Sequence, residues 1–220
     1  MKPERGRLTI VGCGPGGAEY LTRQALSAVA GAEVLCGPRF LLDLFPEAGA
    51  ERVVTGAGAR QVAGLVRSRM EEGSRVVLLV TGDPGLHSLA GPVTRLLGRE
   101  RVQVVPGISS LQLAFARLGL PWENARIFSL HGVSGEEARL VLGALAAVST
   151  AAVLCSPVWT PGKILGALRD TAGQREVHVF WDLGRPTEGR MTGTVDELAG
   201  RFEGSGRSVL VLTEAEESDE

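Results

Sequence analysis

The feature that most constrains the fold is a continuous apolar run, Val76–Val80, which soon ends in Gly82-Asp83-Pro84-Gly85. An apolar run without polar alternation is typical of a strand buried on both faces of a parallel sheet. Similar runs at 8–11 and 102–105 also end in glycine-containing turns, and segments of helical period follow. Repeated strand–turn–helix units predict an α/β protein with a parallel sheet.

The same alternation of strands and helices is predicted along the whole chain. Up to residue 120, we expect strands over 8–11, 34–36, 76–80 and 102–105 and helices over 21–30, 60–71, 89–97 and 109–118. Beyond it, we expect strands over 127–130, 151–154, 177–181 and 209–212 and helices over 136–147, 161–169 and 194–202. The stretch 118–128 reads as a linker. We therefore predict two α/β domains, 1–120 and 121–213, and an acidic disordered tail over 214–220.

The net charge of the chain indicates which class of molecule it can bind. The 220 residues carry a net charge of −2, but Glu214, Glu216, Glu217, Asp219 and Glu220 crowd the end of the chain. Setting those five acidic residues aside changes the net charge from −2 to +3. This is far from the basic stripe of a nucleic-acid-binding protein, and it suits an anionic small molecule.

Cysteine usage and the N-terminal sequence bear on localisation. The 3 cysteines are far apart and odd in number, which argues against a disulfide framework and fits a reducing compartment. The opening residues lack the apolar stretch of a signal peptide, and no run approaches the ~20 apolar residues that span a bilayer. We expect a cytoplasmic protein without a membrane segment.

The spacing Gly12-x-Gly14-x-x-Gly17 is that of a dinucleotide-binding loop. That loop requires an acidic residue about 20 positions further on, at the end of the second strand, to bind the ribose. Here the second strand ends in Cys36-Gly37 without a carboxylate, and only Arg39 would be available for a 2′-phosphate. We favour a tight strand-to-helix turn, and an NAD- or flavin-binding module stays as the alternative from another functional class.

Polar residues follow two of the predicted strands. Thr81, Gly82 and Asp83 come after 76–80, at the edge of the sheet where ligands of open α/β sheets bind. Asp83 has two interpretations, a ligand contact or an Asx turn before Pro84. Ser109 and Ser110 follow the strand over 102–105, either as helix caps or as lining of the same site.

Other catalytic signatures are absent from the sequence. His87, His131 and His178 show no metal-ligand spacing, and neither a phosphate-binding P-loop nor a nucleophile elbow is present. His131, just after a predicted strand, either faces a substrate or is a surface residue.

Three segments together resemble a known family. "VGCGPGGAEYLT", "VTGDPGLHSLA" and "VVPGISSLQLAFARLGLPWENARIFSLHG" are similar, in order and spacing, to the tetrapyrrole (corrin/porphyrin) methyltransferases. The resemblance extends over about residues 7–212. The GDPG loop and the "SLHG" run are most like the branch that methylates carbon 5 of precorrin-7 or cobalt-precorrin-7 in cobalamin synthesis. The uroporphyrinogen-methylating branch differs, since it carries Thr-Ala in place of Ser109-Ser110 and GGDPF in place of the GDPG loop.

The resemblance implies two α/β domains with a cofactor cleft between them, and S-adenosylmethionine as the cofactor. Carried over by position, the cofactor contacts are Pro15, Thr81, Gly82, Asp83, Leu86, Ser109, Ser110, Leu154, Cys155 and Leu183. The cofactor brings an activated methyl group, so the protein must hold the acceptor carbon ~3–3.5 Å from it and exclude water. No general base stands out, and Asp83 and His131 are the catalytic candidates.

The resemblance also implies partners. The substrate would be an anionic tetrapyrrole, with Arg39 or Arg185 either clamping its carboxylates or serving as ordinary surface charge. A homodimer is implied, as is a separate protein for methylation and decarboxylation at carbon 15. The alternatives are another precorrin position or a different acceptor, such as diphthamide or an rRNA ribose, although the modest charge argues against RNA.

Overall fold

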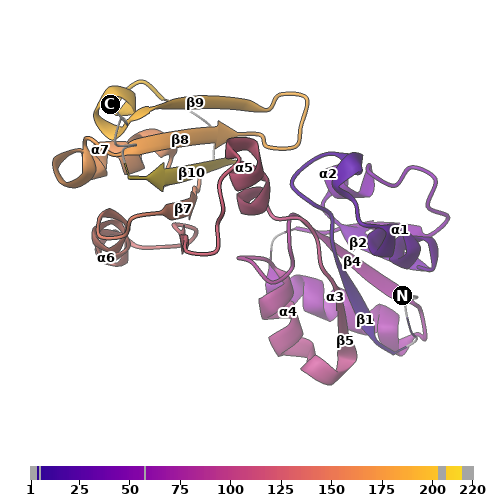
Figure 1. The fold of residues 1–220 in the computed structure, drawn as a ribbon. Helices are drawn as coiled ribbons and strands as arrows, with labels where there is room; N and C mark the ends of the chain where they lie inside the picture. Colours follow the sequence, from indigo (N-terminus) through magenta and orange to yellow (C-terminus); the bar gives the residue numbers. More distant parts are fainter. Residues whose placement is uncertain (1–3, 5, 57, 203–206, 215–220) are drawn as a thin grey trace. The chain divides into compact units, whose positions relative to one another are not determined.

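The structure, a computed structural model, describes residues 4, 6–56, 58–202 and 207–214. The chain forms two compact units, residues 1–109 and 110–220 (Figure 1). The division therefore falls before the linker that the sequence suggested near residue 120. Helix α5 (Ser110–Leu118) belongs to the second unit because it packs against strand β10 of that unit.

Five parallel strands form the sheet of the first unit, in the order β3-β2-β4-β1-β5. The strands are β1 (Leu8–Gly12), β2 (Val34–Gly37), β3 (Glu51–Val54), β4 (Val76–Val80) and β5 (Val102–Val105). The predicted parallel sheet is confirmed. All residues of β4 are buried at the centre of the sheet, as its continuous apolar run indicated. Strand β3 was not predicted, because it is a short edge strand whose side chains are mostly exposed.

Helices cover both faces of this sheet (Figure 1). They are α1 (Arg23–Ala30), α2 (Arg39–Leu42), α3 (Ala59–Glu71) and α4 (Ala90–Leu97), with 3-10 turns η1 (Ala18–Tyr20) and η2 (Arg99–Arg101). Successive side chains of a strand point to opposite faces. Accordingly, Val77 and Leu79 pack with α1 and α2, whereas Val76 and Leu78 pack with α3 and α4. The first unit is thus a three-layer sandwich.

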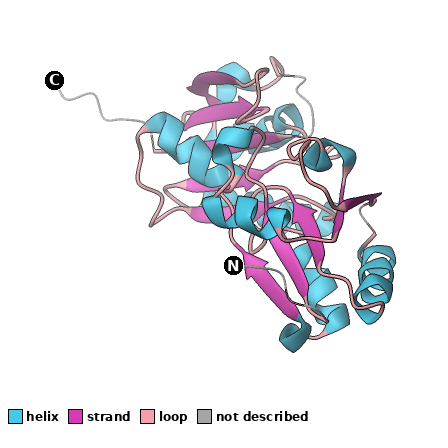
Figure 2. Ribbon diagram, turned by 90° about the vertical axis from the view of Figure 1, so that its right-hand side faces the viewer, coloured by secondary structure: helices cyan, strands magenta, loops and turns pink. Residues whose placement is uncertain are grey.

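The sheet of the second unit is mixed, in the order β6-β7-β10-β8-β9. Strands β6 (Arg126–Ser129) and β7 (Ala151–Leu154) are parallel, and the other pairings, with β10 (Ser208–Thr213), β8 (Glu176–Trp181) and β9 (Gly189–Thr194), are antiparallel. Helices α6 (Gly135–Ala146), α7 (Pro161–Ala172) and α8 (Val195–Leu198) share one apolar core with the sheet. Figure 2 shows helices layered against strands, as expected of α/β domains.

Two elements of the second unit differ from the sequence expectation. The helix expected over 194–202 ends at Leu198, because Ala199 is extended and Gly200 has a φ of +85°. Strand β9 was not predicted, since GRMTGT has two glycines and little apolar character, yet it pairs with β8 along its whole length. Of the predicted acidic tail, residues 215–220 lie outside the described part of the chain. Among the described residues, no helix has the length and apolar character needed to cross a membrane.

Candidate functional site

The candidate site is built on three loops that follow neighbouring strands of the first unit. Strands β4, β1 and β5 are adjacent and parallel, so the loops after Val80, Gly12 and Val105 leave the same edge of the sheet. This is the edge at which open α/β sheets bind ligands. The polar residues predicted from the sequence at 81–83 and at Ser109 therefore share one edge.

The backbone joins the first two loops directly. The N–H of Gly82 donates to the carbonyl of Gly14 over 2.8 Å, and the N–H of Gly14 donates to the carbonyl of Gly82 over 3.3 Å. Both glycines have positive φ, +75° for Gly14 and +66° for Gly82. Glycine adopts this conformation without the penalty that a Cβ imposes, so the two residues can form this isolated bridge beyond the ends of their strands.

Close backbone packing also joins the third loop. A Cβ on Gly12 would lie 2.7 Å from both the nitrogen of Gly107 and the carbonyl oxygen of Gly82. A Cβ on Gly107 would overlap the same Gly82 oxygen. Sequence reasoning singled out Gly12 for its spacing in a dinucleotide motif. The structure assigns it a different role, since the absence of a Cβ leaves room for the backbone of Gly82 and Gly107 and for the ring of Pro84.

The carboxylate of Asp83 also links these three loops, which together form a frame at the edge of the sheet. One oxygen, Oδ1, accepts a hydrogen bond of 2.7 Å from the N–H of Gly85, and Oδ2 accepts one of 3.1 Å from the N–H of Gly107. The first contact is the Asx turn considered from the sequence, and the second ties the loop after β4 to the loop after β5. Sequence reasoning missed this cross-loop contact. A carboxylate accepts more than two hydrogen bonds, so lone pairs remain for a ligand.

The other predicted residues of this unit differ in exposure. Thr81 is exposed, Leu86 is half-buried, and Pro15 is buried. Ser109 is buried, with its Cα 3.8 Å from the position that a Cβ on Gly82 would occupy. Arg39 is exposed at the start of α2, just after β2. The edge thus presents backbone groups, a hydroxyl and one carboxylate, a donor and acceptor set suited to holding a polar ligand in a fixed orientation.

The glycine loop after β1 departs from dinucleotide-binding geometry. In that fold the loop leads directly into a helix whose N-terminus receives the pyrophosphate. Here η1 intervenes, and α1 begins only at Arg23, with the hydroxyl of Thr22 capping the N–H of Ala25 at 3.0 Å. The N-terminus of α1 is therefore already capped by its own side chain.

The remaining predicted residues lie in the second unit. Leu154 ends β7, Cys155 follows it, and Leu183 follows β8; Cys155 and Leu183 are buried. His131 is exposed in the turn after β6, where its N–H donates to the Ser129 hydroxyl over 3.3 Å. The structure thus places the two catalytic candidates, Asp83 and His131, in different units.

Cysteine and metal chemistry find no support in the described part of the chain. Burial raises the pKa values of Cys13, Cys36 and Cys155 to about 12, so these thiols stay protonated at neutral pH. Among the described residues, no group of three or more His, Cys, Asp or Glu side chains could hold a metal ion.

Comparison with known proteins agrees with the motif resemblance. The model of one family, described as Tetrapyrrole (Corrin/Porphyrin) Methylases, matches residues 7–199. The cobalt-precorrin-7 C(5)-methyltransferase of Salmonella typhimurium is 34% identical over 125 residues, which are 57% of this chain and 61% of that protein. The decarboxylating precorrin-6Y C(5,15)-methyltransferase of a Sinorhizobium species is 32% identical over 129 residues, 57% of this chain and 30% of that protein. The matches thus span less than two thirds of either relative.

A solved structure extends the similarity to nearly the whole chain. The uroporphyrin-III C-methyltransferase of Thermus thermophilus, complexed with S-adenosylhomocysteine, has a TM-score of 0.75 at 28% sequence identity. The match covers 94% of this chain and 97% of that structure. The similarity therefore includes both units, and the two-domain α/β fold expected from the motifs is confirmed.

Proposed function

Because this chain belongs to the tetrapyrrole (corrin/porphyrin) methylase family, we propose that it transfers a methyl group from S-adenosylmethionine to a carbon of a tetrapyrrole in cobalamin biosynthesis. The observation that carries the proposal is the frame of three strand-end loops, within which Gly12, Gly82 and Gly107 make direct backbone contact. The related Thermus thermophilus structure is complexed with S-adenosylhomocysteine, the product that this reaction would release.

The residues at this edge fit such a cofactor. S-adenosylmethionine carries hydroxyl, amino and carboxylate groups, which need both hydrogen-bond donors and acceptors. The exposed Thr81 hydroxyl, the remaining lone pairs of Asp83 and the backbone of the loops offer both. Pro15, Leu86, Ser109, Ser110, Leu154, Cys155 and Leu183 remain proposed contacts on the family resemblance.

These groups indicate which part of the reaction the cofactor performs and which part the protein performs. The cofactor, when bound, supplies an activated methyl group. The protein's task is to fix the orientation of both reactants and to keep water out. A rigid backbone frame serves this task, since preorganised groups need not be ordered when the reactants bind. Acid–base catalysis is a minor element of this proposal, and Asp83 is its candidate in the first unit.

For the acceptor, we propose carbon 5 of precorrin-7 or cobalt-precorrin-7. The name of the Salmonella relative specifies this position, and the name of the Sinorhizobium relative includes it. That second relative is much longer than the match and is also named for carbon 15. We therefore propose that a separate protein methylates carbon 15 and removes the carboxyl group. A homodimer located in the cytoplasm completes the proposal.

Two measurements test this function. Calorimetry should show one S-adenosylhomocysteine site per chain and no comparable heat with NAD, and an absorbance scan should show no bound flavin. Mass spectrometry of precorrin intermediates, incubated with the protein and methyl-labelled cofactor, should then show one labelled methyl on precorrin-7 at carbon 5. Labelling at another carbon would overturn the position alone. NAD binding without S-adenosylhomocysteine binding would overturn the methyltransferase.

A further inference from the structure

A cavity of about 260 Å³ lies between α4 and the edge strand β5 of the first unit. Its walls come from Pro84 and Gly85 of the loop after β4, from one side of α4, from Arg99 on η2 and from Val104 on β5. That loop is the one that we propose binds the cofactor. The cavity therefore adjoins the proposed cofactor site, within the same unit of the chain.

Two arginines supply the charge of this cavity. Arg95 comes from α4 and Arg99 from η2, and both are exposed. The Nη1 atom of Arg95 lies 3.7 Å from the position that a Cβ on Gly91 would occupy. Gly91 also lines the cavity, so this contact places the guanidinium at the cavity wall. The arginines considered from the sequence, Arg39 and Arg185, do not line it.

Neither arginine of the cavity forms an ion pair with an acidic residue in the part of the chain that the structure describes. The nearby carboxylates have other positions. Glu100 folds against Gly98, where its carboxylate takes the space that a Cβ would need. Asp83 accepts from the N–H groups of Gly85 and Gly107. The cavity lining thus has two cationic side chains and no acidic one.

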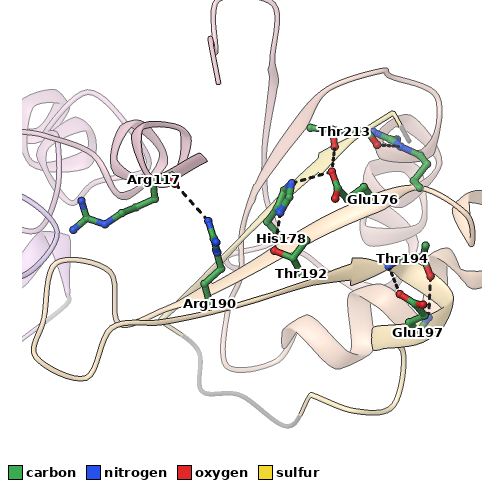
Figure 3. A network of polar contacts seen from close by, with 9 residues as sticks. Arg117, Glu176, His178, Arg190, Thr192, Thr194, Glu197 and Thr213 are labelled. Carbon is green, nitrogen blue, oxygen red and sulfur yellow. Dashed lines mark hydrogen bonds and ion pairs between the residues drawn. The ribbon is translucent and has the colours of Figure 1, made fainter. Parts of the chain in front are cut away.

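Arginines elsewhere in the chain are bonded within the fold. Arg169, which lines a cavity at the end of α7, lies with Nε 3.6 Å from Oδ1 of Asp196. Arg117 on α5 donates from Nε to Oε1 of Glu188 over 2.7 Å. The guanidinium of Arg190 donates to the backbone carbonyl of Arg117 over 3.4 Å (Figure 3). An arginine with such a partner must first lose it to bind an anion, whereas the two arginines beside the GDPG loop need not.

The rest of the cavity lining suits a carboxylate carried on an apolar arm. Val104 is 46% exposed, and Pro84 and Ala90 add apolar surface, while Thr94 offers a hydroxyl group. A hollow lined by one sign of charge concentrates ions of the opposite sign. Pockets that enclose a whole small-molecule ligand usually have ~300–1,000 Å³. The smaller volume found here fits one side arm of a large ligand rather than a macrocycle.

We propose that Arg95 and Arg99 bind a carboxylate group at the periphery of the tetrapyrrole substrate, an inference that rests on the proposed function. A planar guanidinium group matches a carboxylate with paired N–H donors. The wall formed by Gly85 is fixed before binding, because its N–H is bonded to Asp83. The cavity then selects an acceptor by its acidic arms and holds it beside the loop that binds the cofactor.

The test measures binding of uroporphyrin, a carboxylate-rich porphyrin, by fluorescence, together with S-adenosylhomocysteine binding by calorimetry. The charge variants are Arg95→Gln and Arg99→Gln. The matched controls are Arg60→Gln, at the start of α3 after the opposite edge strand β3, and Arg139→Gln on α6. Both control arginines are exposed, and each control removes the same charge.

Gly91→Leu tests the cavity without changing the charge. The new side chain would extend into the hollow beside Arg95, and leucine favours a helix over glycine, so the fold should be kept. Gly64→Leu is the matched control, because Gly64 lies within α3 and a Cβ there would meet nothing within 4 Å.

We expect uroporphyrin to bind about tenfold more weakly to each arginine variant, the loss of one charge-assisted hydrogen bond. Gly91→Leu should give a similar loss, because it blocks the arm. The affinity for S-adenosylhomocysteine should not change. Coproporphyrin, with fewer carboxylates, should be less sensitive to the variants than uroporphyrin. Citrate in excess, a free carboxylate without a ring, should not displace uroporphyrin.

Several outcomes would overturn the carboxylate site. They are equal losses in variants and controls, no loss in the variants, and displacement of uroporphyrin by citrate, which would assign the cavity to a free anion. Wild-type protein that binds S-adenosylhomocysteine but not uroporphyrin would overturn it as well. Failure of the wild type to bind S-adenosylhomocysteine would instead overturn the proposed function.

Discussion

The carboxylate of Asp83 accepts a hydrogen bond from the backbone N–H of Gly107, 3.1 Å away, and so links the loops after β4 and β5. The same carboxylate accepts from the N–H of Gly85 at 2.7 Å. Two donors therefore depend on one side chain, in the loop that we propose binds the cofactor.

Replacing this carboxylate should affect both stability and binding. Asn can accept with its single side-chain oxygen, but its amide nitrogen would face a second N–H donor. We expect Asp83→Asn to lower the free energy of unfolding by about 1–2 kcal/mol and to weaken S-adenosylhomocysteine binding about tenfold. Chemical denaturation and calorimetry measure the two effects. Asp170→Asn, at an exposed position on α7, is the control and should match the wild type. Wild-type stability in Asp83→Asn would contradict the bracing role.

The backbone contact at Gly107 predicts a strong steric effect. In Gly107→Ala the new methyl would overlap the carbonyl oxygen of Gly82 and approach the carbonyl carbon of Gly12 to 2.8 Å. We expect a loss of about 1–3 kcal/mol in the free energy of unfolding, with weaker cofactor binding.

A glycine in open space provides the matched control. Gly64 lies within α3, and a Cβ there would meet nothing within 4 Å. Gly64→Ala should raise the stability by about 0.5–1 kcal/mol, because alanine favours the helix. Thermal melts of the two variants compare them directly, and equal shifts in the same direction would refute the close-packed frame.

The pair formed by Arg117 and Glu188 predicts a pH-dependent contribution. The hydrogen bond from Arg117 holds the pKa of Glu188 below its usual value of 4.5. Because the pKa is depressed in the folded state, the stabilisation is present above pH ~4.5 and is lost as the pH falls through the folded-state pKa. Both side chains are partly exposed, so the contribution should be no more than about 1 kcal/mol. Urea unfolding of Glu188→Gln and wild type should differ at pH 7 and converge in acid; a gap that widens in acid would contradict the pair.

Burial of the three cysteines predicts their reactivity. The thiolate is the reactive form, and burial raises the pKa of each thiol to about 12. In the native protein at pH 8, we expect no reaction with a thiol-specific disulfide reagent. In denaturant, all 3 thiols should react. Rapid labelling of the native protein would show that the units open more readily than the structure indicates.

The fold was largely readable from the sequence because several of its strands are mainly apolar runs followed by turns that contain glycine or proline. This pattern located β1, β4 and β5, and it placed Thr81, Asp83 and Ser109 at one edge. It could not locate β3 or β9, since these edge strands have few buried side chains and depend on pairing with a distant partner. The boundary between the units was also missed, because α5 is assigned by its packing on β10 rather than by a local signal.

The site was less predictable than the fold for a physical reason. The family resemblance named residues by position, but the contacts that shape the loops come from the backbone of Gly12, Gly82 and Gly107. Backbone contacts between distant segments have no periodic signature in a sequence. The Asp83–Gly107 bond and the Arg117–Glu188 pair join residues 24 and 71 positions apart and were missed for the same reason.

The glycine contacts of the first unit have a consequence for how new specificity can arise. Because main-chain contacts and the Asp83 carboxylate hold the loops together, their shape does not depend on the side chains of Thr81 and Leu86, which take no part in these contacts. Substitutions at Thr81 and Leu86, which we propose contact the cofactor, should therefore change ligand binding while the scaffold keeps its form. A laboratory library that randomises these two positions and leaves the glycines intact should yield mostly folded clones, from which altered ligand preference can be selected.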